Sequence, residues 1–155
     1  GGLLPGLATA LAVALVGGTI AAVTLARRSE SIPTIGDIGA LLPRNRPELL
    51  LGALLSVNAG VVEELLFRLA VPALIFGATG SAPTAVIGSL LLFGMLHFYQ
   101  GWAGIVGATV VGALLMVLYL ATGSILVAIV AHALIDLRSL VLIPMLVFEV
   151  QKVRA

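Results

Sequence analysis

Residues 49–76 read LLLGALLSVNAGVVEELLFRLAVPALIF, an almost unbroken apolar run that carries Glu63, Glu64 and Arg68 near its middle. A run of about 18 or more apolar residues is long enough to cross a bilayer as a helix. An ionisable side chain at bilayer depth costs at least about 2.5–3.5 kcal/mol, so it usually faces a protein interior and marks a site. The stretch therefore predicts a transmembrane helix that carries part of a functional site.

The composition of the whole chain agrees with a membrane protein. Its 155 residues are 61% hydrophobic and 10% charged, with a mean hydropathy of +1.23, whereas soluble domains are about 45–50% apolar and about 25% charged. There is no cysteine, which excludes disulfides and thiolate metal sites. A net charge of +1 without a dense basic cluster gives no sign of a nucleic-acid partner. We expect one integral membrane domain over residues 1–155.

Hydropathy predicts an all-α bundle of about five transmembrane spans, whose motif helices converge on a buried polar cavity. The spans are expected over residues 3–26, 49–76, 84–98, 102–121 and 125–148. No basic residue precedes the first run, so we expect a retained span rather than a signal peptide. The chain lacks an initiating Met, and we expect it to be a trimmed piece of a longer protein. Pro72 should kink the second span because proline removes a backbone donor.

Basic residues suggest an orientation in the membrane. If five spans alternate, one side collects Arg27, Arg28, Arg44, Arg46, Lys152 and Arg154. The positive-inside rule makes that side cytoplasmic, so the amino terminus is expected outside and the carboxyl terminus inside. The polar connector between the first two spans contains residues 35–42, for which we expect a short interfacial helix.

Two more apolar runs carry ionisable side chains, in Phe93-x-x-x-His97 and His132-x-x-x-Asp136. Residues four apart lie on one helical face, so His132 and Asp136 should point the same way. At 1.5 Å per residue, we expect Glu63, His97 and Asp136 at similar depths well inside the membrane. The sequence thus predicts one buried site built from three helices.

The two glutamates should differ in role. Glu64 and Arg68 are four residues apart and can neutralise one another, while Glu63 lies about 100° around the helix axis. A buried glutamate without such a partner is suited to act as a general base. Two histidines and several carboxylates can bind zinc, through Glu63, His97 and His132. They can also activate water directly, and either route hydrolyses an amide.

The three motifs together resemble those of the CPBP intramembrane proteases. Glu63-Glu64-Leu-Leu-Phe-Arg68, Phe93-Gly-Met-Leu-His97 and His132-Ala-Leu-Ile-Asp136 stand in that family's order, in separate apolar segments. The family joins the type II CAAX prenyl endopeptidases with bacteriocin-processing and self-immunity proteins. The resemblance implies a peptidase of a bacterial or archaeal cell membrane, with residues 49–148 as its catalytic core. It implies a peptide or lipidated-peptide substrate.

The resemblance also implies roles for single residues. Glu63 and His97 would activate water, while His132 and its partner Asp136 would hold the oxyanion; Glu64 and Arg68 would support them. The prenyl endopeptidases typically have asparagine where this chain has Asp136. Because an ionised aspartate cannot donate a hydrogen bond, Asp136 would have to be protonated, orient His132 or bind a metal.

Other interpretations stay open. The scaffold could serve a catalytically inactive immunity or partner-binding protein, or a proton-coupled transporter, although internal repeats typical of transporters are absent from the sequence. Single motifs also have structural explanations: an ion pair of Glu64 with Arg68, a packed His97, or a simple His132–Asp136 hydrogen bond. We expect Arg138 to extend its head group to the interface. Phe98, Tyr99 and Trp102 are expected to pack or to line the interface.

Overall fold

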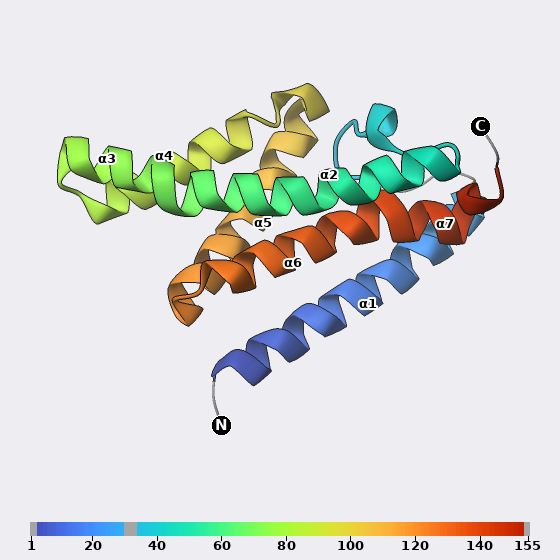
Figure 1. Ribbon diagram of the computed structural model, residues 1–155, viewed down its shortest axis with the longest axis horizontal. Coiled ribbons are helices and arrows are strands. Elements are labelled where there is room, and N and C mark those ends of the chain that lie inside the picture. The colour runs from blue at the N-terminus through green and yellow to red at the C-terminus, as the bar shows by residue number, and fades with distance from the viewer. Residues whose placement is uncertain (1–2, 30–33, 154–155) are drawn as a thin grey trace.

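The computed structural model describes residues 3–29 and 34–153, which are helical with short connections and contain no strand. The α-helices are α1 (Leu3–Ser29), α2 (Arg46–Glu64), α3 (Val71–Thr79), α4 (Ala82–Met95), α5 (Gly101–Thr122), α6 (Ile125–Leu137) and α7 (Ile143–Phe148). Two π-helical segments are η2 (Leu65–Ala70) and η4 (Arg138–Leu142), and three short 3-10 turns are η1 (Gly39–Leu41), η3 (Phe98–Gln100) and η5 (Val150–Lys152). The predicted all-α bundle is confirmed (Figure 1).

Four of the described helical stretches are long and apolar enough to cross a membrane, and they are Pro5–Arg28, Arg46–Thr79, Phe98–Thr122 and Ile125–Phe148. The predicted second span is therefore one continuous helix of 34 residues. The fifth apolar helix, α4, has 14 residues and spans only about 21 Å at 1.5 Å per residue. It ends at Met95, so His97 lies in the turn beyond the helix and not within a span, contrary to expectation.

The helix ends follow from local sequence. The Asn45 side chain caps α2 by accepting a hydrogen bond from the Glu48 N–H, and the Glu48 carboxylate accepts one in return from the Asn45 amide. Gly80 and Gly123 end α3 and α5 in the left-handed conformation, which glycine adopts without strain. The short turns that follow fold α4 back along α3 and α6 back along α5.

Each π-helical segment ends two residues before a proline. The Val71 N–H bonds to Leu66 O just before Pro72, and the Ile143 N–H bonds to Arg138 O just before Pro144. Proline has no N–H and its ring clashes with the carbonyl four residues earlier, and a wider π turn accommodates both defects. The defect near Pro72 is thus a π-helical segment that includes Arg68, within a helix that continues from Arg46 to Thr79.

The first π segment frees a carbonyl that α4 uses. Phe67 O would accept the Val71 N–H in an α-helix, but here it accepts a hydrogen bond of 2.7 Å from the Ser89 hydroxyl. Ser89 is fully buried. A buried carbonyl without a partner is costly, so this hydrogen bond fixes α4 against the helix that carries Glu63 and Glu64.

Removal of this hydroxyl should therefore destabilise the bundle. We expect Ser89→Ala to lower the free energy of unfolding by about 1–3 kcal/mol, because it leaves Phe67 O buried and unpaired. Reversible unfolding in mixed micelles measures this change. Thr79→Ala is the control, since the Thr79 hydroxyl bonds to a carbonyl on the exposed surface of α3. Equal stability of the two variants would contradict the role assigned to Ser89.

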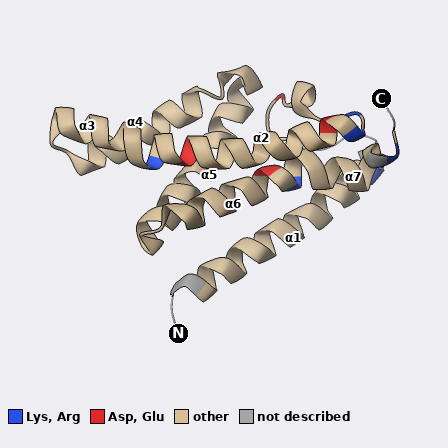
Figure 2. Cartoon of the chain, viewed as in Figure 1, with Lys and Arg blue, Asp and Glu red and all other residues tan. Residues whose placement is uncertain are grey.

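The polar connections gather at one end of the bundle. The Asp37 N–H bonds to Gln100 O at 2.9 Å, and the Arg46 N–H bonds to Val153 O at 3.2 Å. Figure 2 shows basic residues at this end, near the start of α2 and the end of α7. Arg154 lies outside the described residues. The interfacial helix expected over residues 35–42 is reduced to η1, because Gly36 has a φ of +82° that a helix cannot include.

Helix α1 is held to the bundle near its middle. The Arg138 Nε donates a hydrogen bond of 3.0 Å to the Thr19 hydroxyl, which binds η4 to α1. Arg138 therefore does not simply extend to the interface, as we expected from its position. Figure 1 shows α1 diverging from α6 toward the amino terminus.

Candidate active site

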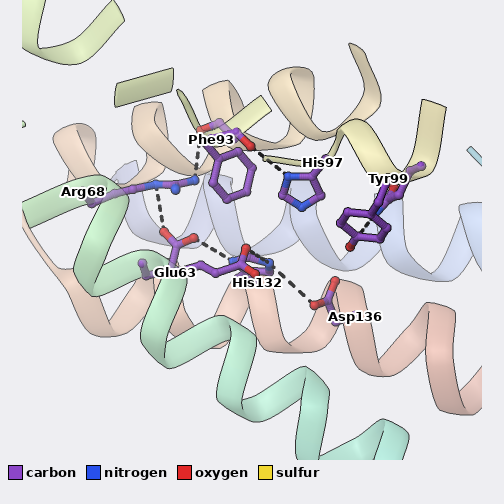
Figure 3. A network of polar contacts seen from close by, with 10 residues as sticks. Glu63, Arg68, Phe93, His97, Tyr99, His132 and Asp136 are labelled. Atoms are coloured by element: carbon purple, nitrogen blue, oxygen red, sulfur yellow. Dashed lines mark hydrogen bonds and ion pairs between the residues drawn. The ribbon is translucent and has the colours of Figure 1, made fainter. Parts of the chain in front are cut away.

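The three motifs meet between α2, α4 and α6 (Figure 3). Close packing of α2 and α6 depends on Gly60, because a Cβ there would lie 3.0 Å from Ala133 Cβ and N. Gly60 is one helical turn before Glu64, so the contact brings the acidic pair of α2 against His132 of α6. The site therefore lies beside a close approach of these two helices.

A buried chain of charged groups forms the interior of the site. Arg68 Nε lies 2.9 Å from Glu64 Oε2, and Glu64 Oε1 lies 2.7 Å from His132 Nδ1. The Arg68–Glu64 contact is an ion pair, since its geometry is not that of a hydrogen bond. Glu64 is fully buried and the other two side chains are nearly so. Because a carboxylate accepts only, His132 Nδ1 must carry the hydrogen.

Arg68 also has partners outside its own helix. Its Nη2 donates a hydrogen bond of 3.1 Å to Gly112 O of α5, and its guanidinium lies 4.9 Å from the centre of the Phe93 ring. A Cβ at Gly112 would lie 2.8 Å from Phe93 Cδ1, so a glycine is needed where these helices meet. The buried cation is thus held by a carboxylate, a carbonyl and an aromatic face.

The other nitrogen of His132 faces two carboxylates. His132 Nε2 lies 3.6 Å from Asp136 Oδ2 and 3.9 Å from Glu63 Oε2. Both distances exceed a direct hydrogen bond, and the Glu63 and Asp136 side chains are 31% and 30% exposed. A spacing of this kind allows one water molecule to contact the imidazole and a carboxylate together. His132 therefore has one buried, fixed nitrogen and one accessible nitrogen.

His97 approaches from the end of α4. The His97 N–H bonds to Gly94 O, which leaves Phe93 O free, and His97 Nδ1 lies 2.8 Å from that oxygen. A carbonyl accepts only, so Nδ1 donates and Nε2 of the neutral ring is available to accept a proton. The Phe93 ring packs 4.9 Å from the His97 ring and 6.3 Å from the His132 ring. Early termination of α4 thus sets the tautomer of His97.

The structure differs from the sequence-based picture in one important contact. We expected Glu64 to pair with Arg68 and His132 to pair with Asp136, and both contacts are present. The hydrogen bond between Glu64 and His132 was not predicted. The rotation of α6 about its axis decides whether His132 meets Glu63 or Glu64 first, and no pattern in one sequence contains that angle.

The residues considered for zinc do not form a metal site. Within residues 3–29 and 34–153, no group of three or more His, Asp and Glu side chains is arranged to hold a metal ion. We therefore assign no step to a metal at Glu63, His97 and His132.

Comparison with known proteins gives one match. The family model described as Type II CAAX prenyl endopeptidase Rce1-like matches residues 45–138. This range covers more than half of the chain and includes every motif residue from Glu63 to Asp136. No curated protein and no solved structure matches the chain.

Proposed function

Because this chain belongs to the Type II CAAX prenyl endopeptidase Rce1-like family, we propose that it is an intramembrane endopeptidase that hydrolyses a peptide bond near or within the bilayer. Membership in this protease family and four membrane-length helices make it an integral membrane protein of hydrolase type. One geometric observation carries the proposal. His132 Nε2 lies between two partly exposed carboxylates, while Nδ1 is fixed by a buried carboxylate.

The Arg68–Glu64–His132 chain gives His132 a fixed direction. Glu64 holds the hydrogen on Nδ1, and Arg68 holds Glu64 in place. Such a carboxylate–imidazole pair fixes the tautomer and supports a positive charge on the ring. In the protonated ring Nε2 also carries a hydrogen, which it can donate to an oxygen that becomes negative. Asp136 Oδ2 lies 3.6 Å from the same Nε2.

Glu63 is the residue we assign as general base. It is the one motif glutamate without an arginine contact, and its carboxylate is partly exposed beside His132 Nε2. The oxygen of a water molecule attacks the carbonyl carbon while Glu63 takes one water proton. The carbonyl electron pair moves to oxygen, where His132 Nε2–H stabilises it. When this pair returns, the C–N bond breaks, and the amine leaves with the proton from Glu63.

We assign His97 to proton transfer together with Glu63. Its Nε2 is free to accept a proton because Nδ1 donates to Phe93 O. Figure 3 shows His97 and Phe93 above the row formed by Glu63, His132 and Asp136. His97 can therefore accept the proton that Glu63 takes from water and pass it on to the leaving amine.

The membrane position follows from the charges at the ends of the bundle. We place the end that contains Arg44, Arg46 and Lys152 in the cytoplasm, by the positive-inside rule. The amino terminus then lies outside. Glu63 is near the centre of the helix from Arg46 to Thr79, about 25 Å from either end at 1.5 Å per residue. The scissile bond would thus be cut near or within the bilayer.

Cleavage of defined peptides tests the proposed function. Purified protein in liposomes is incubated with a peptide library and with the same peptides carrying a farnesyl group on a cysteine. We expect cleavage by wild type and by Glu149→Ala, and no detectable cleavage by His132→Ala. Glu149 is exposed and pairs with Lys152 away from the site. If wild type cuts nothing, an inactive partner-binding protein becomes the better description. If His132→Ala cuts as well as wild type, the cleavage does not depend on this site and the assignment of His132 is rejected.

A further inference from the structure

The site as described has few groups that can donate a hydrogen bond to an oxyanion. Glu63 and Asp136 are acceptors when ionised, and His97 Nε2 is an acceptor in the tautomer set by Phe93 O. His132 Nε2 donates only when the ring is protonated, since its other hydrogen is committed to Glu64. Oxyanion sites usually supply two or more donors. A second, neutral donor is therefore needed near His97 and His132.

Tyr99 is placed to supply that donor. Its ring lies 6.0 Å from the His97 ring at an interplanar angle of 26°. Figure 3 shows Tyr99 next to His97, with its hydroxyl end directed toward the side of the site where Asp136 lies. Within the described residues in contact with the two histidines, Tyr99 is the one with a neutral hydroxyl.

The Tyr99 hydroxyl oxygen accepts a hydrogen bond from its neighbour in the chain. Gln100 Nε2 donates a hydrogen bond of 2.8 Å to Tyr99 Oη. This contact uses an acceptor position of the oxygen and leaves the phenolic hydrogen free to point elsewhere. No described residue accepts that hydrogen. A phenol that accepts one hydrogen bond is also a stronger donor, because hydrogen bonds in a chain polarise one another.

The turn that carries Tyr99 is held firmly from outside the site. The Gln100 N–H bonds to His97 O, and Gln100 O accepts from the Asp37 N–H. Gly36 packs directly on α5, because a Cβ there would lie 2.7 Å from Gly104 Cα. The connector therefore fixes the turn between α4 and α5, and with it the spacing between His97 and Tyr99. A donor fixed in this way needs no rearrangement when charge develops.

We propose that the Tyr99 hydroxyl donates a hydrogen bond to the oxyanion of the tetrahedral intermediate, together with His132 Nε2–H, and is a catalytic residue of this site. The proposal rests on the proposed peptidase function and adds a residue outside the three motifs. The proton stays on Tyr99 throughout, because the oxyanion accepts a hydrogen bond and returns its electron pair to the carbonyl when the C–N bond breaks.

Substitutions that separate the hydroxyl from the ring test this role. We expect Tyr99→Phe to lower kcat about 10²-fold or more, with little change in KM, since removal of one oxyanion donor has effects of this size. Tyr99→Ala should lower kcat by about the same factor. Tyr119→Phe, near the opposite end of α5, is the matched control and should keep the wild-type kcat. Thermal unfolding of all three variants shows whether each is folded.

A second readout does not depend on turnover. A peptidyl phosphonate carries anionic oxygens in the geometry of the tetrahedral intermediate, whereas a non-cleavable peptide resembles the substrate. Tyr99→Phe should bind the phosphonate at least about tenfold more weakly and the peptide equally well. Unchanged phosphonate binding, or a Tyr99→Phe kcat equal to that of Tyr119→Phe, overturns the proposal. If Tyr99→Phe keeps wild-type activity and Tyr99→Ala loses it, the ring only positions His97.

These outcomes are distinct from a failure of the proposed function. If wild type cleaves peptides, Glu63→Gln does not, and Tyr99→Phe retains full kcat, the peptidase assignment stands and the role of Tyr99 is rejected. If wild type cleaves no peptide and binds no phosphonate, the peptidase function is rejected and the role of Tyr99 with it.

Discussion

Peptide cleavage by the Glu63→Gln variant is expected to be about 10³-fold slower than cleavage by wild type, with a smaller change in KM. A positioned general base contributes about 10²–10⁴-fold to a rate, and glutamine keeps the shape of the side chain but cannot accept a proton. Glu63 has no arginine contact and its partly exposed carboxylate lies 3.9 Å from His132 Nε2. The substitution removes no buried ion pair, so the variant should fold and bind substrate normally.

The control for this experiment is Glu149→Gln. Glu149 is exposed and pairs with Lys152 away from the site, so the Glu149→Gln variant should have the kcat of wild type. Single-turnover rates in liposomes separate the chemical step from product release. A Glu63→Gln variant within about threefold of wild type would show that another group activates water, because loss of a general base cannot be so small.

The largest effect on stability is expected for Glu64→Ala. Its carboxylate is fully buried and contacts both Arg68 and His132. Removal leaves the Arg68 side chain, of which only 2% is exposed, without a carboxylate to pair with its charge. Breaking a buried ion pair from one side costs about 3–5 kcal/mol. We expect a loss of this size in the free energy of unfolding, measured in mixed micelles of dodecylmaltoside and sodium dodecyl sulfate.

A double-mutant cycle separates the ion pair from the cavity left by truncation. If the pair contributes as described, Glu64→Ala combined with Arg68→Ala destabilises the protein less than the sum of the single variants. Glu149→Ala is the matched control for loss of an exposed carboxylate, with an expected effect within about 1 kcal/mol. A Glu64→Ala variant as stable as Glu149→Ala would contradict the assignment of Glu64 to the buried interior.

Much of the fold was predictable because a membrane-spanning helix requires a long apolar run, which is visible in the sequence. The apolar run around Glu63 predicted a span, and the structure extends it from Arg46 to Thr79. Proline at position 72 predicted a local defect, and the structure shows it as a π-helical segment. The end of α4 was misplaced, because the hydrogen bonds that stop it at Met95 involve the His97 N–H and ring. Hydropathy does not register such contacts.

The residues of the candidate site could be predicted from the sequence, but not all of the contacts between them. Spacing of four residues correctly paired Glu64 with Arg68 and His132 with Asp136, because both pairs lie within one helix. The Glu64–His132 bond joins residues 68 positions apart, and the rotation of two packed helices decides it. Tyr99 carries no motif signal, and its aromatic ring near a span end suggested an interface residue. Its position became evident only when the turn after α4 was placed beside His97.

The central claim is that Glu63 activates a water molecule for direct attack on a peptide carbonyl. A single turnover of wild type in ¹⁸O-labelled water, followed by mass spectrometry of the new carboxyl terminus, tests it most directly. The account predicts one ¹⁸O atom in the product carboxylate and none in the Glu63 side chain. A new carboxyl terminus without the label, with ¹⁸O found in Glu63, would show that this residue attacks the carbonyl itself and would contradict the claim.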